Sequence, residues 1–337
     1  MSKLGAGVIG LRMGASHVAG FKEHPDVDVV AVCDVREETA WKVAEEYGVE
    51  TWSTDYREVV EREDVDIVSV CTPDHLHREH VVAALEAGKH VLCEKPMALT
   101  SEDCEAMIAE ADRSGRQLMV GQVCRFAPGF RTAKQIVRSG RIGELFFVES
   151  EYAHNYTKVP GVGGWRKDPE IGREPVIGGG IHAVDLVRWM AGNCVEVSAY
   201  ANHKGLPDWP RNDCTIAAMR FENEVIGKVF VSIGCRRPYT MRSVFYGTEG
   251  TIVCDNTTPH IRLYTTEFAD SPDFTTIPIS LASHNVAAEI RELVDAVLND
   301  RSVSTDGREG ARSVATCLAI VESAKHGGRP VHVRNAF

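Results

Sequence analysis

The stretch KLGAGVIGLRMGASH, residues 3–17, decides the fold of the first third of the chain. A short apolar run ends at Gly10, a glycine-interrupted turn follows, and a helical pattern runs from Gly14 to His24. Such a turn lets a pyrophosphate approach the backbone and meet the positive end of a helix. The glycines fit the dinucleotide-binding pattern imperfectly, because Arg12 stands where a second glycine is expected. An ordinary glycine-rich turn therefore explains this stretch equally well.

Asp34 favours the dinucleotide explanation. It ends the apolar run Val27–Cys33 and stands 24 residues after Gly10, close to the spacing at which an acid accepts hydrogen bonds from ribose hydroxyls. A carboxylate there repels a 2′-phosphate, so we expect NAD as the preferred cofactor, while the neighbouring Arg36 leaves NADP open. Asp34 alone is also a common helix-capping residue.

Apolar runs alternate with helical patterns up to about Cys124, which predicts an α/β fold with βαβ units on a doubly wound parallel sheet. Beyond Cys124 most runs alternate between apolar and polar residues and the later ones lack helices between them, which predicts a second α/β domain with a large, open, mostly antiparallel sheet. Two amphipathic helices are expected near the end, around 286–298 and 311–324. We therefore expect a dinucleotide-binding Rossmann domain over residues 1–124 and a substrate-binding and oligomerisation domain over residues 125–337.

Composition limits the function classes. The chain has 337 residues and a formal charge of −11, which opposes non-specific nucleic-acid binding. No apolar run approaches the length of a membrane helix, so we expect no membrane partner. The ten cysteines form no CxxC pair, which predicts reduced, buried thiols and a cytoplasmic location.

Polar residues gather where the predicted parallel strands end, and ligands bind at that edge of such sheets. Besides Gly10 and Asp34, the strand ends carry the segments 71–77, 94–96 and 121–122. A purely structural sheet has no need of a lysine placed directly between an apolar strand and a proline, as Lys95 is. The histidines of segment 71–77 lack a third ligand at a recognisable metal spacing, so we expect no metal.

Several segments resemble the Gfo/Idh/MocA family, which includes glucose–fructose oxidoreductase and inositol dehydrogenases. They are TPDHLH at 72–77, AGKHVLCEKP at 87–96, GRIGE at 140–144 and GIHAVDL at 180–186. The likeness covers nearly the whole chain. It implies hydride transfer between NAD(P) and a secondary alcohol of a sugar, sugar derivative or inositol-like polyol.

The resemblance also implies roles for individual residues. Lys95 contacts the nicotinamide ribose and the substrate hydroxyl, His182 is the acid/base, and Asp185 supports the helix that carries His182. The Lys95–Pro96 peptide is expected to be cis. The expected cofactor contacts are Gly10, Arg12, Met13, Asp34, Thr72, Pro73, His75, His77, Glu94, Lys95 and Gln122.

One departure concerns Gly178, which stands where many relatives carry an aspartate four residues before the histidine. A lysine–aspartate–histidine relay therefore cannot be transferred whole. Since a histidine has an ordinary pKa near 6.5, we expect His182 to take the proton while Lys95 polarises the substrate oxygen, although the reverse assignment remains open.

The substrate pocket is expected to use polar and aromatic side chains, which suit polyhydroxylated rings. The candidates are Arg125, Tyr152, His154, Trp165, Arg166 and Tyr239. We expect a small-molecule polyol or sugar as partner, and a homodimer or homotetramer. Two alternatives stay open: an NAD-dependent glycoside hydrolase acting by transient oxidation, and a non-catalytic NAD(P)-binding regulator.

Overall fold

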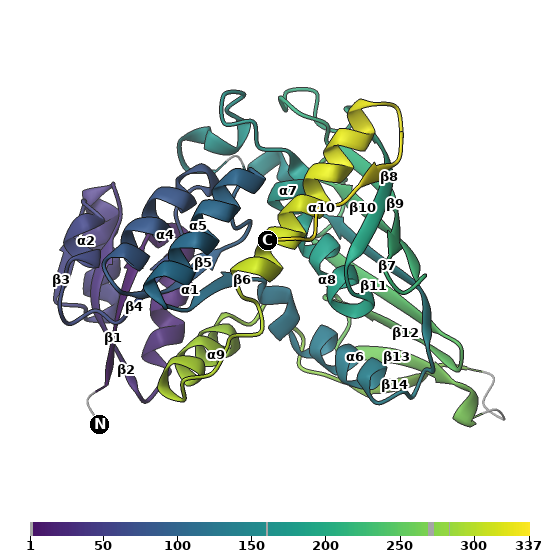
Figure 1. The fold of residues 1–337 in the computed structure, drawn as a ribbon, viewed down its shortest axis with the longest axis horizontal. Coiled ribbons are helices and arrows are strands. Elements are labelled where there is room, and N and C mark those ends of the chain that lie inside the picture. The colour runs from purple at the N-terminus through teal and green to yellow at the C-terminus, as the bar shows by residue number, and fades with distance from the viewer. Residues whose placement is uncertain (1–2, 160, 269–272, 283) are drawn as a thin grey trace. The chain divides into compact units, whose positions relative to one another are not determined.

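The computed structural model describes residues 3–159, 161–268, 273–282 and 284–337 (Figure 1). The chain divides into two compact units. Unit 1 comprises Met1–Val123, Val286–Ala311 and Phe337, and unit 2 comprises Cys124–Asn285 and Arg312–Ala336. The chain therefore leaves unit 1 after Val123 and contributes a second segment to it later.

Unit 1 is built on a parallel sheet of six strands in the order β3-β2-β1-β4-β5-β6. The strands are β1 (Leu4–Ile9), β2 (Val27–Cys33), β3 (Thr51–Ser53), β4 (Ile67–Val70), β5 (His90–Glu94) and β6 (Leu118–Gly121). The helices are α1 (Leu11–Lys22), α2 (Glu37–Tyr47), α3 (Arg57–Val60), α4 (His77–Glu86), α5 (Ser101–Ser114) and α9 (Val286–Leu298). This strand order is that of a Rossmann sheet, which confirms the predicted fold of the first third.

Most strands of this sheet are largely apolar because they are buried, as the pattern predicted. All four residues of β4 and of β6 are buried. Helix α9 packs on α1, where Gly20 leaves room for it: a Cβ on Gly20 would lie 2.6 Å from the Cδ1 atom of Ile290. Residues from the far end of the sequence thus complete the core of unit 1.

Unit 2 is built on a nine-stranded sheet in the order β14-β13-β12-β11-β7-β10-β9-β8-β15, antiparallel except for the β7–β10 pair. The strands are β7 (Leu145–Ala153), β8 (Cys194–Asn202), β9 (Cys214–Phe221), β10 (Ile226–Ser232), β11 (Thr240–Gly247), β12 (Gly250–Asp255), β13 (His260–Thr265), β14 (Thr275–Pro278) and β15 (Val331–His332). The helices are α6 (Pro128–Arg138), α7 (Pro175–Gly178) and α8 (Ile181–Ala191), while α10 (Gly307–Lys325) is shared between the units. The predicted mostly antiparallel sheet is confirmed.

One face of this sheet is covered and the other is open. Along β9 buried and exposed residues alternate strictly from Thr215 to Phe221. Helix α8 packs against β7 and β10, and ten of its residues are buried. On the open face Ile216 of β9 is 48% exposed and lies opposite Tyr200 of the neighbouring strand β8, which is 63% exposed. The open face therefore carries apolar side chains.

The structure corrects several boundaries. The first helix begins at Leu11 and not at Gly14, so Arg12 and Met13 belong to its first turn. The last helix begins at Gly307. Strands β3, β12, β13, β14 and β15 were not predicted. Within the described residues no helix combines the length and the apolar character needed to cross a bilayer.

Candidate active site

The carboxyl ends of the parallel strands bring five predicted cofactor residues to one edge of the sheet in unit 1. Gly10 follows β1, Asp34 follows β2, Thr72 follows β4, Lys95 follows β5 and Gln122 follows β6. Because neighbouring parallel strands end on the same side, these residues share that edge. The distribution of polar strand ends in the sequence predicted this clustering.

Gly10 lets the glycine turn pass close to a neighbouring strand end. Its φ of +87° lies in the left-handed region, and a Cβ would come within 2.7 Å of the backbone carbonyl of Cys71. Helix α1 starts at the next residue, so its first backbone N–H groups, including those of Arg12 and Met13, stand at the ligand edge of the sheet. The arrangement offers donors to an anion despite the irregular glycine spacing.

Asp34 is buried at the end of β2 and accepts hydrogen bonds from the backbone at the start of α1 and just before α2. Its Oδ2 accepts a hydrogen bond from the backbone N–H of Leu11 at 3.0 Å, and its Oδ1 accepts one from that of Arg36 at 3.0 Å. The Arg36 guanidinium also pairs with Oδ1 at 3.1 Å and is 44% exposed. A carboxylate suited to ribose hydroxyls therefore lies beside a cation suited to a 2′-phosphate.

The loop after β4 is fastened to the segment that carries Lys95. Both ring nitrogens of the buried His77 lie 2.9 Å from carbonyl oxygens, Nδ1 from that of Pro96 and Nε2 from that of Thr72. The peptide between Lys95 and Pro96 is cis, as the resemblance implied. His75, two residues before His77, is exposed. His77 thus braces two strand-end loops, while His75 faces solvent.

Sequence reasoning missed a buried polar cluster around Glu94, the residue before Lys95. His17 Nε2 lies 3.1 Å from Glu94 Oε1, and its Nδ1 lies 2.8 Å from the Ser69 hydroxyl. The other carboxylate oxygen of Glu94 accepts the backbone N–H of Lys95 at 3.1 Å. Glu289, from α9, is fully buried and neither of its carboxylate oxygens has a hydrogen-bond partner.

Charges within this cluster shift its pKa values. Burial opposes protonation of His17, but Cys71 and the carboxylate of Glu94 outweigh it and raise the His17 pKa well above its usual value. Burial raises the pKa of Glu289, the charge of Glu94 raises it further, and His17 and Lys95 offset only part of the rise. Both shifts favour the protonated forms of His17 and Glu289.

The side-chain amide of Gln122 indicates that a cofactor fits this edge of the sheet. Its side chain is 1% exposed, and both its amide nitrogen and its amide oxygen lack a hydrogen-bond partner. A buried amide in that state costs free energy unless a ligand supplies a donor and an acceptor. Ribose hydroxyls or a carboxamide provide both, so the residues of this edge fit a nicotinamide dinucleotide.

His182 forms the centre of the candidate site in unit 2. It is the second residue of α8 and is 3% exposed. Its Nδ1 lies 3.3 Å from the Sγ of Cys124, and its ring centroid lies 5.2 Å from that of His284 and 6.2 Å from that of Tyr152. Nothing in the sequence pattern indicated Cys124 or His284.

Tyr152, whose ring lies near His182, belongs to a group of aromatic side chains that contact one another. The Tyr152 hydroxyl lies 2.9 Å from that of Tyr156 and 3.1 Å from Nδ1 of His154, and its ring lies 5.6 Å from that of Tyr239. Burial raises the pKa of Tyr152 and of Tyr239, so both remain neutral donors. Of the predicted substrate residues, Tyr152, His154 and Tyr239 thus lie together.

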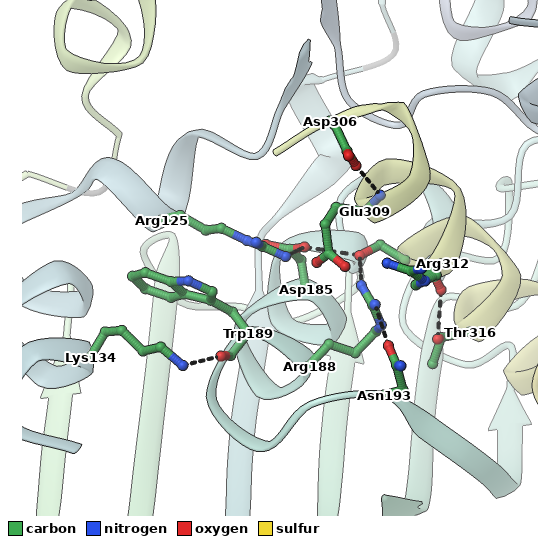
Figure 2. A network of polar contacts seen from close by, with 11 residues as sticks. Arg125, Lys134, Asp185, Arg188, Trp189, Asn193, Asp306, Glu309, Arg312 and Thr316 are labelled. Carbon is green, nitrogen blue, oxygen red and sulfur yellow. Dashed lines mark hydrogen bonds and ion pairs between the residues drawn. The ribbon is translucent and has the colours of Figure 1, made fainter. Parts of the chain in front are cut away.

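Asp185 and Arg125 bind one another in a buried network (Figure 2). The guanidinium donates to both carboxylate oxygens at 2.8 and 2.7 Å, and the side chains are 5% and 1% exposed. Ser313 donates to the same carboxylate at 2.9 Å and accepts a hydrogen bond from Arg188 at 2.7 Å. Asp185 of α8 is therefore held by Arg125 and Ser313, and much of the Arg125 guanidinium is engaged in this contact.

The aspartate missing at Gly178 has a physical explanation. A Cβ on Gly178 would lie 2.0 Å from Nη1 of Arg173, so a buried guanidinium fills the space that a side chain would take. The same guanidinium lies 5.2 Å from the centroid of the Trp165 ring, and that of Arg166 lies 5.3 Å from it. Trp165 and Arg166 thus form a group with Arg173, which sequence reasoning did not include.

A Rossmann sheet with a lysine at its ligand edge, joined in one chain to an open sheet carrying a histidine centre, defines a two-part dinucleotide-dependent oxidoreductase. A family model described as an oxidoreductase family with NAD-binding Rossmann fold matches residues 4–122, and one for the GFO/IDH/MocA C-terminal domain matches residues 130–253. The chain belongs to the Gfo/Idh/MocA family.

Individual relatives agree. The chain is 31% identical to myo-inositol 2-dehydrogenase of Thermotoga maritima, over 74% of this chain and 75% of that protein. It is 29% identical to 1,5-anhydro-D-fructose reductase of Ensifer adhaerens, over 89% of this chain and 90% of that one. A solved levoglucosan dehydrogenase in complex with NADH and L-sorbose superposes with a TM-score of 0.91 at 25% identity, covering 100% of both chains. The predicted family and enzyme class are confirmed.

Proposed function

We propose that this protein transfers a hydride between NAD(P) and a secondary alcohol of a sugar, sugar derivative or inositol-like polyol. The observation that carries the proposal is a group of suitable side chains in each unit. Unit 1 presents Lys95 and the unpartnered amide of Gln122 after the ends of the neighbouring strands β5 and β6, and unit 2 holds His182 near the Cys124 thiol and the ring of Tyr152. Unit 1, which includes Val286–Ala311, then serves the dinucleotide, and unit 2 serves the substrate.

The two side chains divide the acid–base work. In the oxidative direction the imidazole of His182 takes the proton of the substrate hydroxyl, since an ordinary imidazole accepts a proton near neutral pH. The ammonium of Lys95 donates a hydrogen bond to the same oxygen and stabilises the negative charge that develops there. The nicotinamide, when bound, accepts the hydride in this direction and supplies it in the other.

The remaining predicted residues position these groups. The first turn of α1, with Gly10, Arg12 and Met13, is assigned to the pyrophosphate, and Asp34 to the adenosine ribose. Thr72, Pro73, His75, His77 and Glu94 complete the expected cofactor contacts, of which His77 and Glu94 act through the brace and the cluster described above. Tyr152, Tyr239, Trp165, Arg166 and Arg125 are assigned to the substrate side.

A panel of inositols, aldoses and sugar acids, followed by absorbance of the reduced nicotinamide with NAD and with NADP, tests the proposal. On a true substrate, Lys95→Ala and His182→Ala should each lower kcat by at least about 100-fold, the usual contribution of a positioned acid or base. The exposed Lys22→Ala and His326→Ala serve as matched controls and should leave kcat unchanged. Full turnover by both site variants would refute the assignment.

The same panel separates the alternatives. A glycoside hydrolase acting by transient oxidation would split a glycoside without accumulating reduced cofactor. A regulator would bind NAD(P) and turn over nothing. The presence of both Lys95 and His182 supports the dehydrogenase over the regulator.

NAD remains the preferred cofactor, because Asp34 is the buried group at the end of β2 and Arg36 is already paired with it. A homodimer or homotetramer is proposed from the open face of the second sheet, where Tyr200 and Ile216 are exposed opposite one another. A cytoplasmic location is proposed from the ten cysteines, which are all free thiols. Light scattering of Ile216→Asp tests the oligomer.

A further inference from the structure

Three potential metal ligands converge in unit 2. The Cys124 thiol, one ring nitrogen of His182 and one of His284 all lie within 4.8 Å of one another. Cys124 and His182 are buried, while His284 is half-buried. Among the described residues, no other group of three histidine, cysteine, aspartate or glutamate side chains brings its ligand atoms this close together.

Three separate parts of the chain supply these ligands. Cys124 lies in the helical turn Val123–Phe126, His182 in the first turn of α8, and His284 shortly before α9. The contact is therefore a product of tertiary packing, and no spacing motif in the sequence announces it. The network of Arg125 and Asp185 holds the residue next to Cys124 against α8, which fixes the thiol beside the imidazole.

The ligand set and its dimensions suit a particular class of ion. A tetrahedral zinc site with one sulfur and two nitrogen ligands has ligand–ligand separations of about 3.3–3.6 Å. Cys124 Sγ and His182 Nδ1 are already 3.3 Å apart. The widest separation is at most 4.8 Å, so the site closes with a movement of about 1.5 Å at one ring. A thiolate with two imidazoles selects Zn²⁺ or Co²⁺ over Mg²⁺ and Ca²⁺.

The surroundings resemble the outer shell of a metal site. The Tyr239 hydroxyl lies 3.4 Å from Nε2 of His284, and the ring of Tyr152 lies beside that of His182. A hydrogen-bond partner on the ring nitrogen that does not bind the metal orients a metal-bound imidazole. With three protein ligands, the fourth tetrahedral position remains for water or a substrate hydroxyl, as in zinc sites that are not purely structural.

We propose that Cys124, His182 and His284 bind one divalent transition-metal ion of the zinc class. On binding, the Cys124 thiol releases one proton to solvent, the thiolate and the two neutral imidazoles each donate a lone pair to the ion, and no group is oxidised or reduced. The proposal goes beyond the proposed dehydrogenase function, because it concerns a second ligand for His182 and does not depend on turnover.

Cobalt titration of the full-length protein, first freed of metal with a chelator, tests the site directly. One equivalent of Co²⁺ should produce the charge-transfer absorption of a cobalt–thiolate bond together with the strong visible bands of tetrahedral cobalt, and Zn²⁺ should abolish both. Cys124→Ser should remove the thiolate band. His284→Gln should weaken binding by more than about 10-fold, the lower range found even for outer-shell changes.

Cys235→Ser is the matched control, because Cys235 is another thiol of unit 2 that is only half-buried. It should bind Co²⁺ like the parent protein. Circular dichroism and the melting temperature check that each variant is folded. The proposal is overturned if the parent protein shows no thiolate band, or if folded Cys124→Ser retains the band while Cys235→Ser loses it.

Discussion

Replacing Asp185 by asparagine should destabilise unit 2 strongly, because it leaves a buried arginine without its counter-charge. The carboxylate accepts two hydrogen bonds from Arg125 and one from Ser313, and Arg188 lies one hydrogen bond further away. Figure 2 shows this chain of contacts. The asparagine has almost the same shape, so the variant removes charge with little change in volume.

The burial of the pair sets the magnitude. The Arg125 and Asp185 side chains are 5% and 1% exposed, so solvent screens them little. Removing one partner of such a pair costs about 3–5 kcal/mol, since the other charge stays buried and unpaired. The exposed pair Arg141–Glu267, at 46% and 57% exposure in the same unit, is the matched control. Glu267→Gln should cost less than about 1 kcal/mol.

Urea unfolding followed by tryptophan fluorescence measures both variants. Trp189 reports on this region, because the Arg125 guanidinium lies 5.8 Å from the centre of its ring. The double variant Arg125→Met/Asp185→Leu should recover most of the loss, since an apolar pair needs no counter-charge. If Asp185→Asn cost no more than Glu267→Gln, the network would not hold α8 in place.

Four further outcomes are expected. Burial lowers the pKa of His80 to about 4, so His80 binds a proton less readily in the folded protein than in the unfolded chain. The contribution of His80 to the free energy of unfolding, measured with urea, should therefore fall by about 2 kcal/mol between pH 8 and pH 5. His80→Gln should remove this part of the pH dependence. Glu289→Gln should raise the free energy of unfolding at pH 7 and leave it nearly unchanged at pH 4. The pKa of Glu289 is raised in the folded protein, so the carboxyl lowers the stability of the protein as the pH rises above the pKa of the unfolded chain. A lower free energy of unfolding for the variant at pH 7 would mean that Glu289 is charged in the folded protein. Gly10→Ala should lower the free energy of unfolding by at least about 2 kcal/mol in the same assay, since the alanine would have a left-handed backbone and its Cβ would clash with Cys71. An unchanged urea midpoint would contradict the close approach of Gly10 to Cys71. Zn²⁺ in slight excess should suppress polyol oxidation, with recovery on chelation, because the ion takes the lone pair that His182 needs as a base; full turnover by zinc-loaded enzyme would remove His182 from that role.

Most strands of the parallel sheet could be predicted because they are buried on both faces and therefore appear as largely apolar runs, whereas the three-residue β3, with one buried residue, could not. The edge strands of the second sheet could not. In β14, Thr275 and Thr276 are exposed and no residue is buried, so no apolar pattern marks the strand. The first helix was predicted to start too late, because Gly10 and not the later Gly14 ends the turn.

Within the site, Lys95 and His182 followed from family motifs, whereas their neighbours depended on packing. One signal for the missed cluster was present: Glu289 falls three residues after Val286 and four before Leu293, so it lies on the apolar face of α9. A charged residue at such a position is rare unless it has a partner. No pattern could have announced Arg173, since its importance comes from the space left at Gly178.

The course of the chain through unit 1 limits how such a protein can be recombined. Because Val286–Ala311 completes the unit that the first 123 residues begin, and Arg312–Ala336 then returns to unit 2, the two units are interleaved along the chain. A chain truncated after Val123 would expose the surface at Gly20 against which Ile290 packs. Exchange of unit 2 between relatives therefore requires crossover points after Val123, after Asn285 and after Ala311, and a chimera joined at a single point would lack a matched α9.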